Sequence, residues 1–156
     1  MRLHICAVGR MRPGPERELI DDYMTRLDRT GRALGLGPTT ITEVEDKKGG
    51  GMLAEAALLE RALPQGALRV ALDERGTLMT SPRFADRIAG WRDEGRGDLA
   101  FVIGGADGID PGLRATMDFS LSFGKMVWPH MLVRVMLTEQ LYRAATILAG
   151  GPYHRT

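Results

Sequence analysis

The sequence predicts an α/β fold in which a mostly parallel sheet is covered by helices on both faces. First, four apolar runs rich in β-branched residues recur at 3–8, 39–44, 68–72 and 99–104. Second, amphipathic stretches rich in Ala, Leu, Arg and Glu separate these runs and carry helix-starting and helix-ending residues. Strands that alternate with helices in this way are typical of a parallel sheet between two helical layers.

The first half of the chain follows this alternation. LHICAV at 3–8 is predicted to be a strand and not a secretion signal, because its apolar run is short and no small-residue cleavage site follows. The next stretch, PGPERELIDDYMTRLD, begins with prolines and acids, as the first turn of a helix often does. After the second strand, EDKKGGG at 45–51 is predicted to be a mobile loop, too short to separate two domains.

The second half contains two helices and one irregular segment. In SPRFADRIAGWRDEG we expect Ser81 to cap a helix, Pro82 to occupy its first position and Gly95 to end it. FSLSFGKMVWPH is mostly apolar but contains Gly124 and Pro129, so it cannot be one regular strand or helix. The stretch after it predicts about five turns of helix, apolar on nearly all sides. Such a helix is buried on most sides, and a second subunit could supply part of the cover.

Composition limits the classes of protein that fit. The 156 residues suit one domain, 1–156, and no window approaches the 18 or so apolar residues of a membrane span. The single cysteine, Cys6, allows no internal disulfide, so we expect a cytoplasmic protein. A net charge of +1 argues against a broad basic face for nucleic acid. The three histidines and Cys6 show no metal-ligand spacing, so we expect no metal site.

Three loops are candidates for a ligand site, because ligands bind at the carboxyl ends of parallel strands. They are DERG at 73–76, GGADG at 104–108 and SFGKMVWPH at 122–130. Gly104 and Gly105 let a backbone approach a flat ligand closely and offer their amides to it, although a tight turn would explain them equally well. DERG is most simply a solvated turn.

The third loop would expose Phe, Met, Val and Trp side chains unless it lines a pocket or an interface. Free backbone groups in an apolar wall suit the edge of an adenine ring, and an ordinary connection through the core is the alternative. His130 reads as a residue that starts a helix more than as a catalytic one. Glu139 and Arg143 have the spacing of a helical ion pair, but their place on an apolar helix leaves a functional role open.

Together these segments resemble a known family. FVIGGADG, LSFGKMVWPHMLVRVMLTEQLYRA and a terminal YHR, with AVGR near the start and LDERG between, are similar to the ribosomal RNA large subunit methyltransferase H family of the SPOUT superfamily. The resemblance spans the chain. It implies an α/β fold with a C-terminal trefoil knot, which is an exception to the usual rule against knots. It also implies a homodimer that binds S-adenosyl-L-methionine and methylates the N3 ring nitrogen of a pseudouridine in 23S rRNA on the assembled ribosome.

The resemblance also assigns residues to the cofactor site. The matching positions, with Gly105 added for its amide, are Leu72, Gly104, Gly105, Phe123, Gly124, Lys125, Met126, Val127 and Trp128. Many family members have Ser in place of Gly124 and Thr in place of Val127. If backbone groups hold the cofactor, binding survives both changes; a missing hydroxyl contact would cost about 0.5–1.5 kcal/mol. The KKGGG loop also looks shorter than in many relatives, which leaves its RNA contacts open.

The end of the chain carries the candidate catalytic residues. Methyl transfer from a sulfonium requires alignment of donor and acceptor and removal of the acceptor's proton. His154 is the candidate proton acceptor, and Arg155 or Arg143 could stabilise the ring anion or bind a phosphate; Tyr153 and Glu139 complete the set. We expect the tail to fold over the cofactor pocket near a dimer interface.

Two other functions would use the same loops. A non-catalytic α/β module that binds a nucleotide or a protein partner would explain the glycines but not the terminal YHR. An enzyme of the same fold that acts on tRNA would be expected to have a more basic surface or an added RNA-binding domain, and this sequence has neither.

Overall fold

The computed structural model describes every residue from Met1 to Thr156 and has one five-stranded sheet. Its strands are β1 (Arg2–Val8), β2 (Thr39–Val44), β3 (Leu68–Leu78), β4 (Asp98–Ile103) and β5 (Phe119–Ser122). Their order is β2-β1-β4-β3-β5, and every neighbouring pair is parallel. The four predicted strands are confirmed. β5 lies within the segment that the sequence marked as irregular, and it lasts only four residues.

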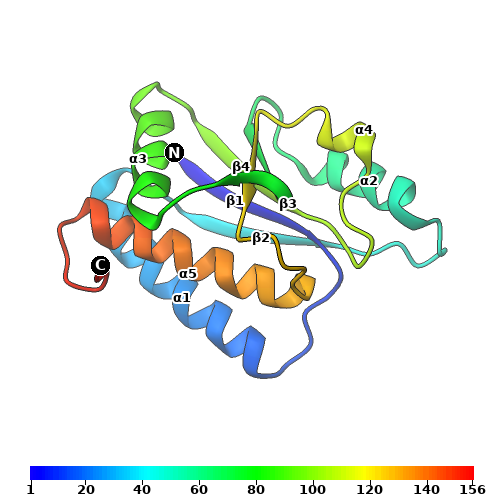
Figure 1. Cartoon of the computed structure of the whole chain (residues 1–156), viewed down its shortest axis with the longest axis horizontal. Coiled ribbons are helices and arrows are strands. Elements are labelled where there is room, and N and C mark those ends of the chain that lie inside the picture. The colour runs from blue at the N-terminus through cyan, green and yellow to red at the C-terminus, as the bar shows by residue number, and fades with distance from the viewer.

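Helices cover both faces of this sheet, as the alternation predicted (Figure 1). The helical segments are α1 (Pro15–Gly31), the short 3₁₀ helix η1 (Arg32–Leu34), α2 (Gly51–Ala62), α3 (Ser81–Asp93), α4 (Pro111–Arg114) and α5 (His130–Leu148). In Figure 1, α1 and α5 run side by side, and α2 and α4 lie on the opposite side of the sheet. Because all five strands are parallel, their carboxyl ends meet at one edge, where the candidate loops leave the sheet.

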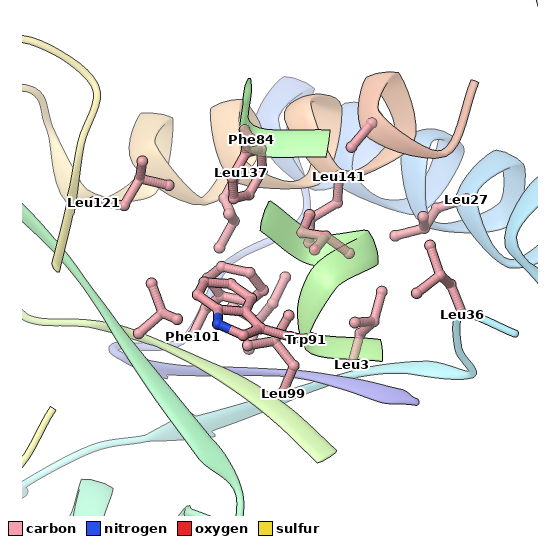
Figure 2. Packing of buried hydrophobic residues seen from close by; sticks show 14 of the residues in the cluster. Leu3, Leu27, Leu36, Phe84, Trp91, Leu99, Phe101, Leu121, Leu137 and Leu141 are labelled. Carbon is pink, nitrogen blue, oxygen red and sulfur yellow. The ribbon is translucent and has the colours of Figure 1, made fainter. Parts of the chain in front are cut away.

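The core has two layers, one on each face. The larger joins the sheet to α1, α3 and α5 through Leu27, Phe84 and Leu137; Figure 2 shows Phe84 and Leu137 over Phe101 of β4, and Leu27 beside Leu36. The smaller joins the other face to α2 and α4. β4 is buried along nearly its whole length, as expected for a strand between two helical layers.

Two local expectations are wrong. The cap of α3 is Thr80, whose Oγ1 accepts the Arg83 N–H at 3.3 Å, and not Ser81. Ser81 is the first helical residue, and its hydroxyl donates to Gln140 Oε1 at 2.7 Å, which ties α3 to α5. The loop after β2 also ends one residue early, because Gly51 already begins α2.

The long α5 is held from several sides. It packs against α1 and α3, and its Thr138, Leu141 and Ala145 are buried. Its Arg134 is only 1% exposed and reaches the carboxyl ends of β1 and β2. The predicted burial of this helix is therefore largely met within one chain, while the trefoil knot stays a prediction.

Candidate functional site

Three loops at the carboxyl edge of the sheet enclose a cavity of about 300 Å³, which we call the three-loop cavity. It lies where β4 and β5 end and beside the Asp73–Gly76 segment of β3, near the edge expected for ligand sites in parallel sheets. Its lining residues are Leu72, Asp73, Glu74, Arg75, Ile103, Gly104, Gly105, Ala106, Asp107, Gly108, Ile109, Leu121, Phe123, Gly124, Met126, Val127, Trp128, His130 and Val133. The volume is at the lower end of the range for small-molecule sites.

The glycines after β4 are required by close backbone packing. A Cβ on Gly104 would lie 2.6 Å from the carbonyl carbon and oxygen of Gly108. Gly105 and Gly108 form an isolated antiparallel bridge in which the Gly108 N–H donates to the Gly105 carbonyl at 3.0 Å. The loop therefore folds back on itself as a tight turn. The same turn also forms a wall of the cavity. The interpretation of these glycines as a tight turn is therefore compatible with their interpretation as part of a ligand site.

The loop after β5 forms the apolar wall. Ser122 shapes its start: its hydroxyl accepts the Gly124 N–H at 3.1 Å and lies within 3.0 Å of the Gly124 carbonyl oxygen. Gly124 has φ of +129°, a conformation that other residues adopt rarely. Beyond it, Met126 and Val127 are 73% and 79% exposed, and Trp128 is 40% exposed. Such exposure of large apolar side chains marks a surface that binds something.

The cavity gathers eight of the nine predicted cofactor-binding residues. These are Leu72, Gly104, Gly105, Phe123, Gly124, Met126, Val127 and Trp128. Lys125 is exposed and does not line the cavity. Sequence reasoning thus found the residues of the three loops, and the structure brings these loops together.

The Asp73–Gly76 segment is not the solvated turn that its sequence suggests. It is a bulge within β3, because Leu72 and Thr77 both pair with Leu121 of β5. The Asp73 side chain is 6% exposed, and its carboxylate lies 3.0 Å from Arg75 Nε and 3.5 Å from Arg114 Nη1. Burial alone would raise the pKa of Asp73, but the hydrogen bonds from Arg75 and the charges of Arg75 and Arg114 lower it. A charged carboxylate therefore lines the cavity.

His130 also lines the cavity, although its position predicted only a helix start. It is the first residue of α5, so it both starts the helix and faces the site. Burial and the charge of Arg134 lower the pKa of His130. Its imidazole is therefore neutral near pH 7. No pattern of apolar and polar residues in the sequence predicts that His130 lines the cavity.

The tail docks on α5 of its own chain. Tyr153 donates its hydroxyl to Glu139 Oε1 at 3.0 Å, and its ring lies beneath the Arg143 guanidinium, 4.8 Å from ring centroid to carbon. Arg143 Nε donates to the same Glu139 oxygen at 3.0 Å, and Arg143 Nη1 donates to His154 Nδ1 at 3.2 Å. Burial raises the pKa of the Tyr153 hydroxyl, and its hydrogen bonds with Tyr23 and Glu139 raise it further. The five candidate catalytic residues thus divide into a connected group of four and an exposed Arg155.

This group does not line the three-loop cavity of the same chain, so the tail does not fold over the pocket within one chain, and its place near a dimer interface stays a prediction. The cavity lies at the His130 end of α5, and the tail leaves from the other end. Nineteen helical residues span about 28 Å, and the eight residues that follow α5 do not run back along it fully extended, because Ala149 and Gly150 still donate to carbonyls of the helix. Gly150 and the Gly151 N–H, which donates to the Thr146 carbonyl at 2.9 Å, turn the chain back along the helix.

A second hollow lies between the tail region and the three-loop cavity. This hollow, of about 540 Å³, lies between α1, α3 and α5, and we call it the helix hollow. Glu139 and Tyr23 line one side of it. Leu121, Phe123 and Gly124 line both the helix hollow and the three-loop cavity. The loop after β5 is therefore the wall between the two.

No group of three or more His, Cys, Asp or Glu side chains is arranged to hold a metal ion. No helix is both long and apolar enough to cross a membrane.

Comparison with known proteins decides the family. The family described as "Predicted SPOUT methyltransferase" matches residues 1–154. The chain belongs to the SPOUT methyltransferases. Among curated relatives, proteins named "Ribosomal RNA large subunit methyltransferase H" are 75% identical in Ruegeria pomeroyi, 73% in Roseobacter denitrificans and 70% in Paracoccus denitrificans. Each match covers 99% of both chains, so the chain is a member of that family within the SPOUT methyltransferases.

Solved structures agree on the fold of this SPOUT methyltransferase. A probable methylase family protein from Haemophilus influenzae superposes with a TM-score of 0.55 at 12% identity, over 99% of this chain and 70% of that one. A probable methyltransferase from Bordetella pertussis gives 0.50 at 16% identity, over 92% and 96%. Family membership favours an enzyme over the non-catalytic module that the loops alone left open.

Proposed function

We propose that this protein transfers a methyl group from S-adenosyl-L-methionine to ribosomal RNA of the large subunit, at the N3 ring nitrogen of a pseudouridine in 23S rRNA on the assembled ribosome. The observation that carries the proposal is the convergence of the three loops in one cavity at the carboxyl edge of the sheet. The name shared by its relatives supports the RNA substrate. The pseudouridine and its nitrogen come from the resemblance in sequence.

The residues of the cavity fit the proposed donor. Phe123, Met126 and Trp128 offer an apolar wall for a flat purine, and the bridged turn of Gly104 and Gly105 lets backbone groups approach its edge. The carboxylates of Asp73 and Asp107 line the same cavity and complement a ligand that carries cationic sulfonium and ammonium groups. When bound, the cofactor supplies a methyl group already activated for transfer.

Binding through the backbone would also explain how this chain dispenses with two hydroxyls. Gly124 and Val127 line the cavity at positions where the family resemblance leads us to expect Ser and Thr. The side chain of Ser122, which is 4% exposed, bonds both polar backbone groups of Gly124 and holds the loop in shape. The wall is thus fixed without a hydroxyl at position 124.

The tail group supplies the chemistry on the acceptor in this proposal. The Arg143 guanidinium donates to His154 Nδ1, so the neutral imidazole carries its hydrogen on Nε2, which can donate a hydrogen bond to a carbonyl oxygen of the acceptor base. His154 would accept the ring proton only at Nδ1, after Arg143 releases that atom. That Nε2 atom is buried and has no hydrogen-bond partner in the chain. Glu139 holds Arg143 and Tyr153 in place, and the positive charge of Arg143 would stabilise a ring anion beside it.

Because the tail does not line the cavity of its own chain, we propose that the enzyme is a homodimer in which the tail of each protomer serves the cavity of the other. Exposed apolar side chains that line the helix hollow support such an interface: Leu19 is 46% exposed and Leu78 56%. Burial of these residues against a second copy would remove an apolar patch from water. The proposed location of this dimer is the cytoplasm, where ribosomes are its substrate.

The experiment compares ribosomes from cells with and without the gene. Digestion of 23S rRNA to nucleosides and mass spectrometry should show one methylated pseudouridine that disappears on deletion and returns when purified protein and S-adenosyl-L-methionine are added to the mutant ribosomes. Equal methylation of free 23S rRNA would contradict the requirement for an assembled ribosome. A methylated nucleoside found only in tRNA would refute the proposal.

A further inference from the structure

A third hollow, of about 510 Å³, lies beside the loop that follows β1, and we call it the arginine hollow. Three exposed arginines, Arg10, Arg12 and Arg17, occupy it. Its remaining lining residues are Met11, Pro13, Glu43 and Glu45. Neither the proposed methyl transfer nor the cofactor site uses any of these residues.

The loop that carries these arginines is anchored from beneath by Arg134 of α5. Arg134 Nη1 lies 2.6 Å from Glu43 Oε2, and its Nη2 donates to the carbonyl oxygens of Val8 at 3.2 Å and Gly9 at 3.1 Å. The Met11 N–H donates to the same Glu43 oxygen at 2.6 Å. A buried guanidinium thus joins the end of β1, the end of β2 and the first residues of the loop. The arginines are presented on a fixed support.

The local charge is positive although the net charge of the chain is only +1. Arg134 compensates Glu43, so Glu45 is the remaining acid of the hollow. Glu45 lies 3.6 Å from Arg10 Nε, and both side chains are largely exposed, so solvent screens this pair. Arg12 and Arg17 have no carboxylate within ion-pair distance.

The arginine hollow adjoins the three-loop cavity. A Cβ on Gly9 would lie 3.6 Å from Nε2 of His130, a residue that lines that cavity. β1 and β2 end at the same edge of the sheet as β4, because the strands are parallel. A nucleic acid whose reacting base enters the cavity would therefore pass its flanking backbone over this loop.

We propose that the arginine hollow binds the phosphate backbone of the RNA segment next to the methylated base. This inference rests on the proposed function for the identity of the RNA. Arginine forks pair with phosphate oxygens in a bidentate manner, and a small rigid cluster suits a folded ribosomal surface better than a long basic stripe would. The hollow is how a nearly neutral protein recognises a polyanion.

The test compares two triple variants with equal loss of charge. R10Q/R12Q/R17Q removes the cluster, and R29Q/R32Q/R96Q removes three exposed arginines that precede β2 and β4, at the opposite edge of the sheet. The first readout is binding of the purified protein to ribosomes from the deletion strain, by co-sedimentation over a range of salt concentrations. The others are methyl transfer to those ribosomes and calorimetric titration with S-adenosyl-L-methionine.

The cluster variant should bind ribosomes at least about tenfold more weakly, with a KM raised by the same factor and an unchanged affinity for S-adenosyl-L-methionine. Its slope of log affinity against log salt should fall by about 2, since about 0.7 counterion is released per phosphate on single strands. The matched variant should behave as the wild type. An unchanged slope in the cluster variant, or equal losses in both variants, would overturn the inference. Salt-dependent ribosome binding without methyl transfer by the wild type would instead refute the proposed function and leave the hollow as a binding surface.

Discussion

Gly104 gives the sharpest test of the cofactor site, because the structure shows what any side chain there would meet. In Gly104→Ala the new Cβ would lie 2.6 Å from the Gly108 carbonyl, about 0.8 Å short of the 3.4 Å at which ordinary contact begins. The obstacle is backbone that is bridged to Gly105, so it cannot rotate away as a flexible side chain could. The turn must therefore move.

Overpacking of this kind costs about 1–3 kcal/mol. If the displaced turn forms a wall of the cofactor site, a comparable part of this cost appears in binding. The dissociation constant for S-adenosyl-L-methionine should then rise by about 5- to 150-fold. Isothermal titration calorimetry measures this change directly, and circular dichroism melting shows whether the fold persists.

Gly90→Ala is the matched control. Gly90 lies in α3, is exposed, and has nothing within 4 Å of an added Cβ. Alanine in a helix interior stabilises relative to glycine by up to about 1 kcal/mol, so this variant should melt slightly higher and bind the cofactor normally. A folded Gly104→Ala protein that binds S-adenosyl-L-methionine as tightly as the wild type would refute the assignment of this turn to the cofactor site.

Three further predictions concern the tail and the buried groups. Deletion of 153–156 should abolish methyl transfer in a radiolabel assay and leave calorimetric cofactor binding largely intact; full activity would exclude a catalytic tail. Burial raises the pKa of the Cys6 thiol to about 11, so Ellman's reagent should react at pH 8 only after unfolding, and the free energy of unfolding should fall as pH rises from 9 to 11. Glu43→Gln should cost about 3–5 kcal/mol in urea unfolding, because it leaves the buried Arg134 guanidinium without its counter-charge, whereas Arg134→Met, which leaves a carboxylate that water can reach, should cost less.

Local sequence patterns predicted most of the elements correctly. The runs at 3–8, 39–44, 68–72 and 99–104 became parallel strands because each combines β-branched residues with flanking turns. The cap of α3 was missed by one residue, since Thr80 and Ser81 are both good caps and only the path of the preceding chain chooses between them. The short β5 was missed because four residues before a glycine carry little periodic signal.

The parts of the candidate site that depend on local backbone conformation were predictable from the sequence. The parts that depend on contacts between distant segments were not. Glycines and exposed apolar residues in Gly104–Gly105 and Phe123–Trp128 marked two walls of the cavity from their composition alone. Asp73 and His130 carried no such mark. Both face the cavity only because β3 bulges beside β5 and because α5 begins where the loop after β5 ends.

The sequence by itself determined the four longer strands and their alternation with helices, the loops that could carry a ligand and, through a family resemblance, the expected chemistry. These features depend on residues near one another in the chain, where spacing and backbone preference act directly. The tertiary structure decided that the three loops share one cavity, that the tail reaches Glu139 of its own chain and not that cavity, and that Arg134 supports a cluster of arginines 117 to 124 positions away in sequence. Contacts over such separations depend on how the sheet orders its strands, which no local pattern encodes.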